Sequence, residues 1–140
     1  MSDRYFLDTN IIIYSFNERE PAKQERAQNL IETGLKENHT MVSYQVVQEF
    51  INAAIRKFTV PMSHGDCRLF IDNVLSHFWE VYASRQLVNS ALDLSERWQY
   101  SFYDALIIAA ALEASCTVLY SEDLQHRQKI YSLQIINPFA

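Results

Sequence analysis

The sequence predicts one α/β domain, spanning residues 1–140, with a mainly parallel sheet and helices on both faces. Short apolar runs of strand character alternate along the chain with helical patterns. Only two Gly and three Pro residues interrupt this alternation, so neither a linker nor a repeat is indicated. A chain of 140 residues, 49% of them hydrophobic, can bury one continuous core. Strands and helices that alternate in this way form parallel sheets joined by right-handed crossovers.

Each element follows from a local pattern. The apolar runs predict five strands, at residues 5–7, 40–43, 79–82, 117–120 and 133–136. A short helix is expected after Asp8, and Pro21 opens a longer one because proline suits the first helical position. Ser63 and Asp66 form an S-x-x-D helix start. Two more helices are expected within residues 41–58 and 101–114, the second of them apolar on nearly every side.

The net charge of −5 and the pI of about 5.3 argue against a nucleic-acid binder with a broad basic surface. Four acids discussed below contribute four of these negative charges, and removing them leaves −1. The acidity is therefore expected to be local, where a bound divalent cation would offset it. The alternative is that the acids only keep the surface soluble.

Cysteine usage and hydropathy indicate the compartment. Cys67 and Cys116 belong to no CxxC motif, and each falls on the apolar side of a predicted helix. Buried free thiols fit a reducing compartment. No apolar run reaches 18 residues, and the N-terminus has no basic leader or apolar signal region. We expect a cytoplasmic protein that does not associate with membranes.

Four acidic residues, Asp8, Glu49, Asp104 and Asp123, each stand where an apolar strand ends or an adjoining helix begins. In a parallel sheet the carboxyl ends of the strands open onto one crevice, where ligands bind. The four carboxylates are therefore expected to converge. Several oxygen ligands of this hard type suit Mg²⁺ or Mn²⁺ rather than zinc, and these ions are common catalysts of phosphodiester cleavage.

The first two acids have structural alternatives. Asp8 lies in YFLDTNIII, where Thr9 and Asn10 are expected to hold its carboxylate in place, although Asp8 or Asn10 could serve only as a helix cap. Glu49 borders an apolar helical stripe and is expected to face the crevice. Arg56, seven residues on, shares the face of Glu49 and could contact a substrate phosphate. The alternative for both is an ordinary solvated helix face.

The other two acids have alternatives of the same kind. Asp104 opens the apolar helix within SFYDALIIAAALEA and could merely complete a capping box with Ser101. The helix dipole would also keep a carboxylate there ionised. Asp123 follows the strand in TVLYSEDL and is favoured as a metal ligand, with Glu122 as a secondary candidate. Ser121 could instead cap a short helix whose first turn is acidic.

Taken together, the segments resemble the PIN-domain family, particularly the VapC-type toxins. The motifs that carry the resemblance occur in order across almost the whole chain: FLDTN (6–10), QEF (48–50), SFYDALI (101–107), YSEDL (120–124) and the ending IINPF (135–139). The resemblance implies a three-layer α/β/α sandwich with a five-stranded parallel sheet ordered 3-2-1-4-5. It also implies metal-dependent cleavage of RNA and a role as the toxin of a toxin–antitoxin pair. Two departures from the family pattern put substrate preference in doubt: Tyr103, where Trp is common, and His126 with Arg127, where Gly is common.

The resemblance also implies residue roles and partners. Asp8, Glu49, Asp104 and Asp123 would be the acidic set, supported by Asn10 and Ser121. The implied partners are an RNA substrate, a protein antitoxin and a second copy of the chain in a homodimer. Four basic residues could contact RNA phosphates beside the site, although exposed basic residues are more often only solvated: Arg56, Lys57, Arg127 and Lys129.

The expected chemistry uses one or two Mg²⁺ or Mn²⁺ ions and leaves 5′-phosphate and 3′-hydroxyl ends. Without metal the acids should repel one another, which should raise the pKa of one or more of them. The four His residues show no ligand spacing, so no catalytic His is expected.

Three other classes use similar residues. An aspartate-nucleophile phosphatase would place a second Asp where Asn10 stands, and it would give Glu49 no role. A phosphorylated receiver domain pairs two acids near its first strand, whereas this chain has Asp8 alone. A catalytically silent RNA-binding or protein-interaction domain would make the acidic set a coincidence, because clustered carboxylates are costly unless they are compensated.

Overall fold

The computed structural model describes residues 3–140. The strands are β1 (Tyr5–Leu7), β2 (Thr40–Ser43), β3 (Trp79–Val81), β4 (Val118–Tyr120), β5 (Lys129–Ile130) and β6 (Leu133–Ile136). The α-helices are α1 (Thr9–Tyr14), α2 (Pro21–Glu37), α3 (Tyr44–Arg56), α4 (His64–Phe70), α5 (Ser76–Phe78), α6 (Arg85–Trp98) and α7 (Phe102–Glu113). One turn of π-helix, Ile71–Leu75, joins α4 to α5.

The sheet has the order β3-β2-β1-β4-β6-β5. The five predicted strands are present, pair in parallel and follow the predicted order 3-2-1-4-5, with β6 in the fifth place. The predicted number of strands was wrong by one, because β5 pairs antiparallel with β6 and forms the edge of the sheet. This strand has only two residues and lies between Arg127 and Tyr131, which both have positive φ. It is too short to show an alternating apolar pattern.

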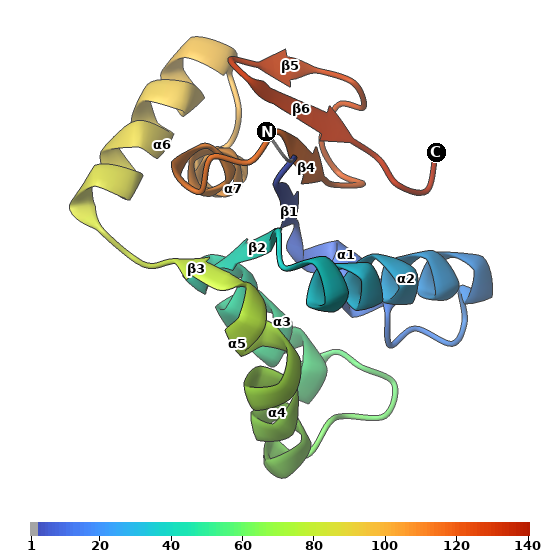
Figure 1. Cartoon of the computed structure of the whole chain (residues 1–140). Coiled ribbons are helices and arrows are strands. Elements are labelled where there is room, and N and C mark those ends of the chain that lie inside the picture. The colour runs from blue at the N-terminus through green and yellow to red at the C-terminus, as the bar shows by residue number, and fades with distance from the viewer. Residues whose placement is uncertain (1–2) are drawn as a thin grey trace.

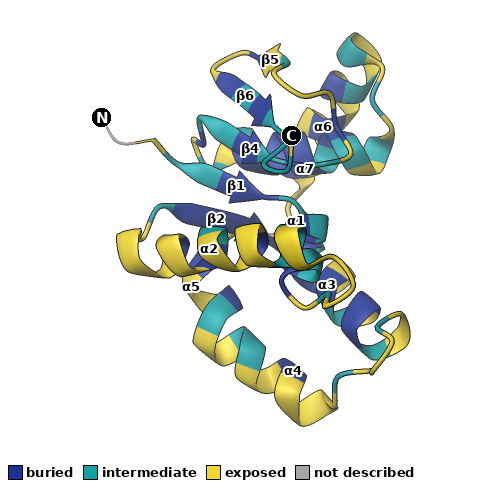
Figure 2. Ribbon diagram, turned by 90° about the vertical axis from the view of Figure 1, so that its right-hand side faces the viewer, coloured by how far each residue is buried: buried dark blue, intermediate teal, exposed yellow. Residues whose placement is uncertain are grey.

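The elements form the predicted α/β/α sandwich. Helices α6 and α7 lie on one side of the sheet, and α1 and α2 lie on the other, while α3 to α5 extend beyond the β2–β3 edge (Figure 1). The buried layer of strands is covered on one side by α2, whose outward face is exposed (Figure 2). Among the described residues, no helix has both the length and the apolar character needed to cross a membrane.

Two helices follow their predicted starts. Pro21 stands at the beginning of α2, and the Ser63 hydroxyl accepts a hydrogen bond of 3.0 Å from the Asp66 backbone N–H at the start of α4. Helix α6 was not predicted, although its signals are present. Ser84 caps its first turn, and its buried residues Leu87, Ala91 and Leu94 have helical spacing.

Both cysteines are buried and free, as predicted. Burial raises the pKa of the Cys116 thiol to about 12, so this thiol stays protonated at neutral pH. The surrounding core is continuous and includes Phe6 and Ile12 from the β1–α1 unit and Ile108 from α7. The buried β1–α1 and α7 units supply the backbone on which Asp8 and Asp104 stand.

Candidate active site

The four predicted acids line one cleft of about 470 Å³ at the carboxyl ends of the central strands. Asp8 follows β1, Glu49 projects from α3, Asp104 lies in the first turn of α7, and Asp123 follows β4. The cleft is also lined by other side chains from the same elements: Thr9, Asn10, Ile13, Gln45, Asn52, Ala53, Lys57, Tyr103 and Ile107. Residues more than a hundred positions apart in the sequence thus share one cavity.

Asp8 both caps α1 and faces the cleft. Its Oδ1 accepts a hydrogen bond of 2.7 Å from the Thr9 backbone N–H, and its Oδ2 accepts one of 2.8 Å from the Ser121 hydroxyl. The capping and cleft interpretations of Asp8 are therefore compatible. Ser121 caps no helix, because residues 121–128 contain none, and its hydroxyl also accepts a hydrogen bond from the Leu124 backbone N–H.

The pKa of Asp8 is raised from its ordinary value of 3.8 to about 6. Burial is the largest cause, because it removes water from the charged form, while the hydrogen bonds from Ser121 and Thr9 act in the opposite direction. The negative charges of Asp123 and Glu49 raise the pKa further. A raised pKa was predicted from repulsion among the acids, but repulsion is the smaller cause.

Glu49 is held by Thr9 across 40 residues of sequence. The buried Thr9 hydroxyl donates a hydrogen bond of 2.6 Å to Glu49 Oε1, and Gln45 Nε2 lies 3.4 Å from Oε2. Gln45 also donates to the Tyr103 carbonyl oxygen, at 3.3 Å. Thr9 was expected to hold Asp8, and it does so through its backbone N–H, while its hydroxyl binds Glu49 instead.

Asp104 does not complete the capping box. Ser101 Oγ accepts a hydrogen bond of 3.3 Å from the Asp104 backbone N–H, so Ser101 alone caps α7. Within residues 3–140, the Asp104 carboxylate makes no hydrogen bond in return. The dipole of this 12-residue helix favours a negative charge at its first turn. The Asp104 carboxylate therefore remains available to the cleft.

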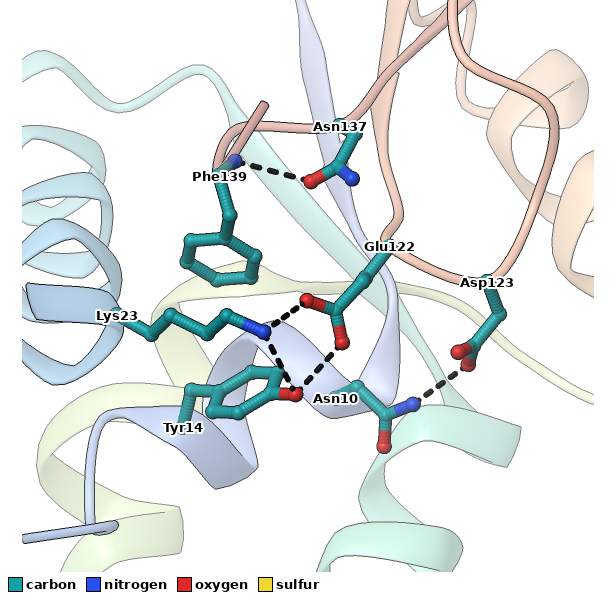
Figure 3. Close-up of polar contacts among 7 residues, drawn as sticks. All are labelled: Asn10, Tyr14, Lys23, Glu122, Asp123, Asn137 and Phe139. Carbon is teal, nitrogen blue, oxygen red and sulfur yellow. Dashed lines mark hydrogen bonds and ion pairs between the residues drawn. The ribbon is translucent and has the colours of Figure 1, made fainter. Parts of the chain in front are cut away.

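The two acids after β4 point in different directions (Figure 3). Asp123 faces the cleft, where Asn10 Nδ2 donates a hydrogen bond of 2.5 Å to its Oδ2. Glu122 does not line the cleft, because its oxygens bind the Tyr14 hydroxyl and the Lys23 ammonium, each at 2.6 Å. The hydrogen bonds from Lys23 and then Tyr14 lower the pKa of Glu122. Asn10 thus supports Asp123 rather than Asp8, contrary to the prediction.

Of the four predicted basic residues, only Lys57 lines the cleft. Arg56 is exposed outside it, although Arg56 was expected to share the face of Glu49. Lys57 is the C-cap of α3, where the backbone leaves the helical path with φ of −115°. Arg127 and Lys129 are exposed outside the cleft, and Lys129 belongs to the edge strand β5.

Six cleft residues were not predicted to belong to the site, and three of them carry polar groups, namely Gln45, Asn52 and Tyr103. Gln45 and Asn52 lie four residues before and three residues after Glu49, which places them on the same face of α3. This spacing is a signal that the sequence contains. Tyr103 precedes Asp104 and has 68% of its surface exposed, so its ring is open to a ligand.

The cleft has the oxygen ligands that a hard divalent cation prefers, and the unpartnered Asp104 carboxylate fits such an ion. Within residues 3–140, however, no three His, Cys, Asp or Glu side chains are grouped closely enough to hold one ion as they stand. Neutral groups donate hydrogen bonds to the other three acids, namely Ser121 to Asp8, Thr9 to Glu49 and Asn10 to Asp123.

The model of the PIN domain family matches residues 5–129, a range that includes all four acids. The chain belongs to the PIN domain family. The matched range stops before the ending IINPF at 135–139, so that part of the resemblance is untested. A comparison with curated proteins found no match.

Solved structures of PIN-like architecture resemble the chain over nearly its full length. A toxin–antitoxin complex from Klebsiella pneumoniae has a TM-score of 0.69 and 20% identity, covering 96% of this chain and 97% of the other. The VapC20 toxin of Mycobacterium tuberculosis, described as cleaving the sarcin–ricin loop, has a TM-score of 0.63 and 23% identity, covering 85% and 89%. VapBC2 of Rickettsia felis, bound to promoter DNA, has a TM-score of 0.64 and 20% identity, covering 94% and 96%. At these identities the similarity shows the PIN fold.

Proposed function

We propose that this PIN domain is a metal-dependent ribonuclease that hydrolyses phosphodiester bonds of RNA and leaves 5′-phosphate and 3′-hydroxyl ends. The observation that carries the proposal is the convergence of four carboxylates, from four distant segments, on one cleft. Such a cluster of negative charge is costly without a cation. The charges of Asp123 and Glu49 add to the burial that raises the pKa of Asp8. A cleavage activity described for the similar VapC20 toxin supports RNA as the substrate.

Asp8, Glu49, Asp104 and Asp123 would hold one or two Mg²⁺ or Mn²⁺ ions. When bound, these cations supply charge stabilisation at the phosphate and lower the pKa of water. The carboxylates would have to move closer together to bind one ion, because no three of them are grouped tightly enough as they stand.

The neutral residues of the cleft orient the acids. The side chains of Thr9, Asn10 and Ser121 each donate one hydrogen bond to a carboxylate, which limits the rotation of that carboxylate. Lys57 places a positive charge at the rim of the cleft, where it would contact a substrate phosphate. Arg56, Arg127 and Lys129 lie outside the cleft and would meet only more distant parts of an RNA.

The proposed partners follow from the comparisons and from a second groove. Similar structures include toxin–antitoxin complexes, which supports a protein antitoxin for this chain. A groove of about 670 Å³ adjoins the cleft and shares Gln45 and Tyr103 with it. Its lining includes the exposed side chains of Tyr44 and Val88, and this apolar surface supports burial against a second copy in a homodimer.

The test is calorimetric Mn²⁺ binding combined with an RNA cleavage assay. Asp104→Asn and Glu49→Gln should each weaken Mn²⁺ binding and should each lower the cleavage rate by roughly a hundredfold or more, because each removes one anionic ligand. Asp93→Asn is the matched control, since exposed Asp93 lies on α6 outside the cleft and should leave both unchanged.

Each outcome separates this proposal from its alternatives. An aspartate-nucleophile phosphatase needs neither Glu49 nor Asp104 for its covalent step, so hydrolysis of a phosphate monoester that survives both changes, without RNA cleavage by the wild type, would favour that class. Wild-type protein that binds no Mn²⁺ and cuts no RNA would instead favour a silent RNA-binding or protein-interaction domain.

A further inference from the structure

The segment 121–123 carries Asp123 but has neither helical nor strand structure. The other three acids of the cleft stand on a helix or at its cap, where the backbone fixes their position. Asp123 lacks this support and is exposed to solvent. Other contacts must therefore set the direction of its side chain.

Three consecutive residues of this segment are bound by residues 8–14. Ser121 donates to Asp8 at 2.8 Å, Tyr14 donates to Glu122 at 2.6 Å, and Asn10 donates to Asp123 at 2.5 Å. Asn10 and Tyr14 are four residues apart on α1, so they lie on the same face of the helix. One short helix thus contacts both acids of the segment.

The Glu122 end of this arrangement is anchored outside the cleft (Figure 3). Lys23 reaches from α2 to within 2.6 Å of Glu122 Oε2, and the two side chains are 32% and 23% exposed. The Lys23 ammonium also lies 4.9 Å from the centroid of the Tyr14 ring and 5.5 Å from that of Phe139. The two rings meet edge to face, with centroids 5.0 Å apart. Partial burial and aromatic packing therefore limit the movement of the Lys23 and Glu122 side chains more than is usual in an exposed ion pair.

We propose that Glu122 is a positioning residue, which through Lys23 and Tyr14 sets the orientation of the Asp123 carboxylate in the cleft. Glu122 and Asp123 are adjacent, and their side chains point in different directions from one irregular backbone (Figure 3). Fixing the Glu122 side chain therefore restricts the backbone rotation that would carry Asp123 away from Asn10. The inference rests on the proposed metal site and adds a residue that does not line the cleft.

The first measurement is Mn²⁺ affinity by calorimetry. Glu122→Ala should weaken Mn²⁺ binding about tenfold, as expected when a partner behind a metal ligand is removed. Glu122→Gln should weaken it less, because the amide keeps the length of the side chain and an acceptor for Tyr14. Tyr14→Phe removes one hydrogen bond and keeps the packing on Phe139, so it decides the question if Glu122→Ala fails to fold.

A double-mutant cycle distinguishes positioning from general stability. If Glu122 acts through Asp123, the effect of Glu122→Ala on Mn²⁺ affinity should disappear in an Asp123→Asn background. A purely structural role predicts the same loss in both backgrounds. In RNA cleavage, Glu122→Ala should lower kcat and leave the KM for RNA unchanged, because it does not touch the Lys57 rim of the cleft.

The matched control is Glu32→Ala, which breaks an exposed ion pair with Lys36 on the same helix as Lys23 and should leave Mn²⁺ affinity unchanged. If the wild type binds Mn²⁺ and cuts RNA but Glu122→Ala and Tyr14→Phe match it, the positioning role is overturned and the ribonuclease proposal stands. If the wild type binds no Mn²⁺, the ribonuclease proposal fails and the positioning role falls with it.

Discussion

The proposed metal site and the buried position of Asp8 favour opposite charge states of its carboxyl group. A metal site needs its carboxylate ionised, whereas its burial beside Glu49 and Asp123 favours the protonated form and raises its pKa to about 6. The folded state therefore binds a proton more tightly than the unfolded state, in which an Asp has a pKa near 3.8. The contribution of Asp8 to stability is fully present below about pH 4 and is lost as the pH rises to about 6.

This difference predicts the effect of Asp8→Asn in the absence of metal. At pH 7 the change should raise the free energy of unfolding by roughly 2 kcal/mol, because it removes a charge that the fold disfavours. Thermal denaturation in EDTA should show a Tm higher by about 5 °C. At pH 4 the Asp8 carboxyl of the folded protein is already protonated, so the Tm should change little.

The control for Asp8→Asn is again Asp93→Asn, which replaces an exposed carboxylate and should leave Tm unchanged at both pH values. An equal rise in Tm at pH 4 and pH 7 would contradict the explanation, because it would point to packing rather than ionisation. If Asp8→Asn raises the Tm and also abolishes metal binding, then the charged Asp8 serves metal binding at the expense of the stability of the fold.

At the scale of the element, Gly34 shows how closely α2 packs against β2. A Cβ at this position would lie 2.5 Å from Thr40 Oγ1 and 3.2 Å from the Phe78 ring. Thr40 is buried, so its side chain has little room to move. In an exposed helix interior, Gly→Ala stabilises by about 1 kcal/mol because it restricts the unfolded chain. Here the overlap should outweigh that gain.

We therefore expect Gly34→Ala to lower the free energy of unfolding by roughly 1–3 kcal/mol, measured by urea denaturation. Gly65→Ala is the matched control within α4, because the nearest atom to its added Cβ is 3.9 Å away. Gly65→Ala should be neutral or slightly stabilising. Equal effects of the two substitutions would show that α2 can move away from β2 without cost.

The elements also show which features the sequence could predict. Asp8 and Asp123 were predictable because each follows a short apolar strand, and Asp104 because it opens a helix; parallel strands bring such positions together. Glu49 lies within α3 and was predictable from its place beside the apolar stripe of that helix. Helix α6 was predictable from Ser84 and the spacing of Leu87, Ala91 and Leu94, because a capping residue and a helical apolar spacing are both local patterns. Strand β5 was not, since two residues carry no periodicity.

The contacts within the site were harder to predict than its members. The bond from Thr9 to Glu49 joins residues 40 apart, and the bond from Asn10 to Asp123 joins residues 113 apart. Such pairings depend on side-chain rotamers and on how α1 packs against its neighbours, which no local pattern specifies. The different directions of the Glu122 and Asp123 side chains likewise depend on Lys23, which is about 100 residues away in sequence.

At the scale of the whole molecule, metal binding, proton release and folding are linked. A ligand that binds only the folded state adds about 2.7 kcal/mol to the free energy of unfolding when its concentration is a hundred times its Kd. Mn²⁺ at that level should therefore raise the Tm at pH 7.5, measured by differential scanning calorimetry. Asp104→Asn should remove the rise, because Asp104 contributes a carboxylate with no other partner within residues 3–140.

The same linkage predicts how this rise depends on pH. Because Asp8 must lose its proton before it can bind an ion, Mn²⁺ affinity should fall about tenfold for each pH unit below the Asp8 pKa of about 6. At a fixed Mn²⁺ concentration the rise in Tm should be constant above about pH 7 and should shrink steadily towards pH 5. Asp8→Asn should abolish this inflection together with most of the affinity. A rise in Tm that is independent of pH between 5 and 7 would mean that Mn²⁺ binds elsewhere on the acidic surface, since ordinary exposed carboxylates titrate near pH 4.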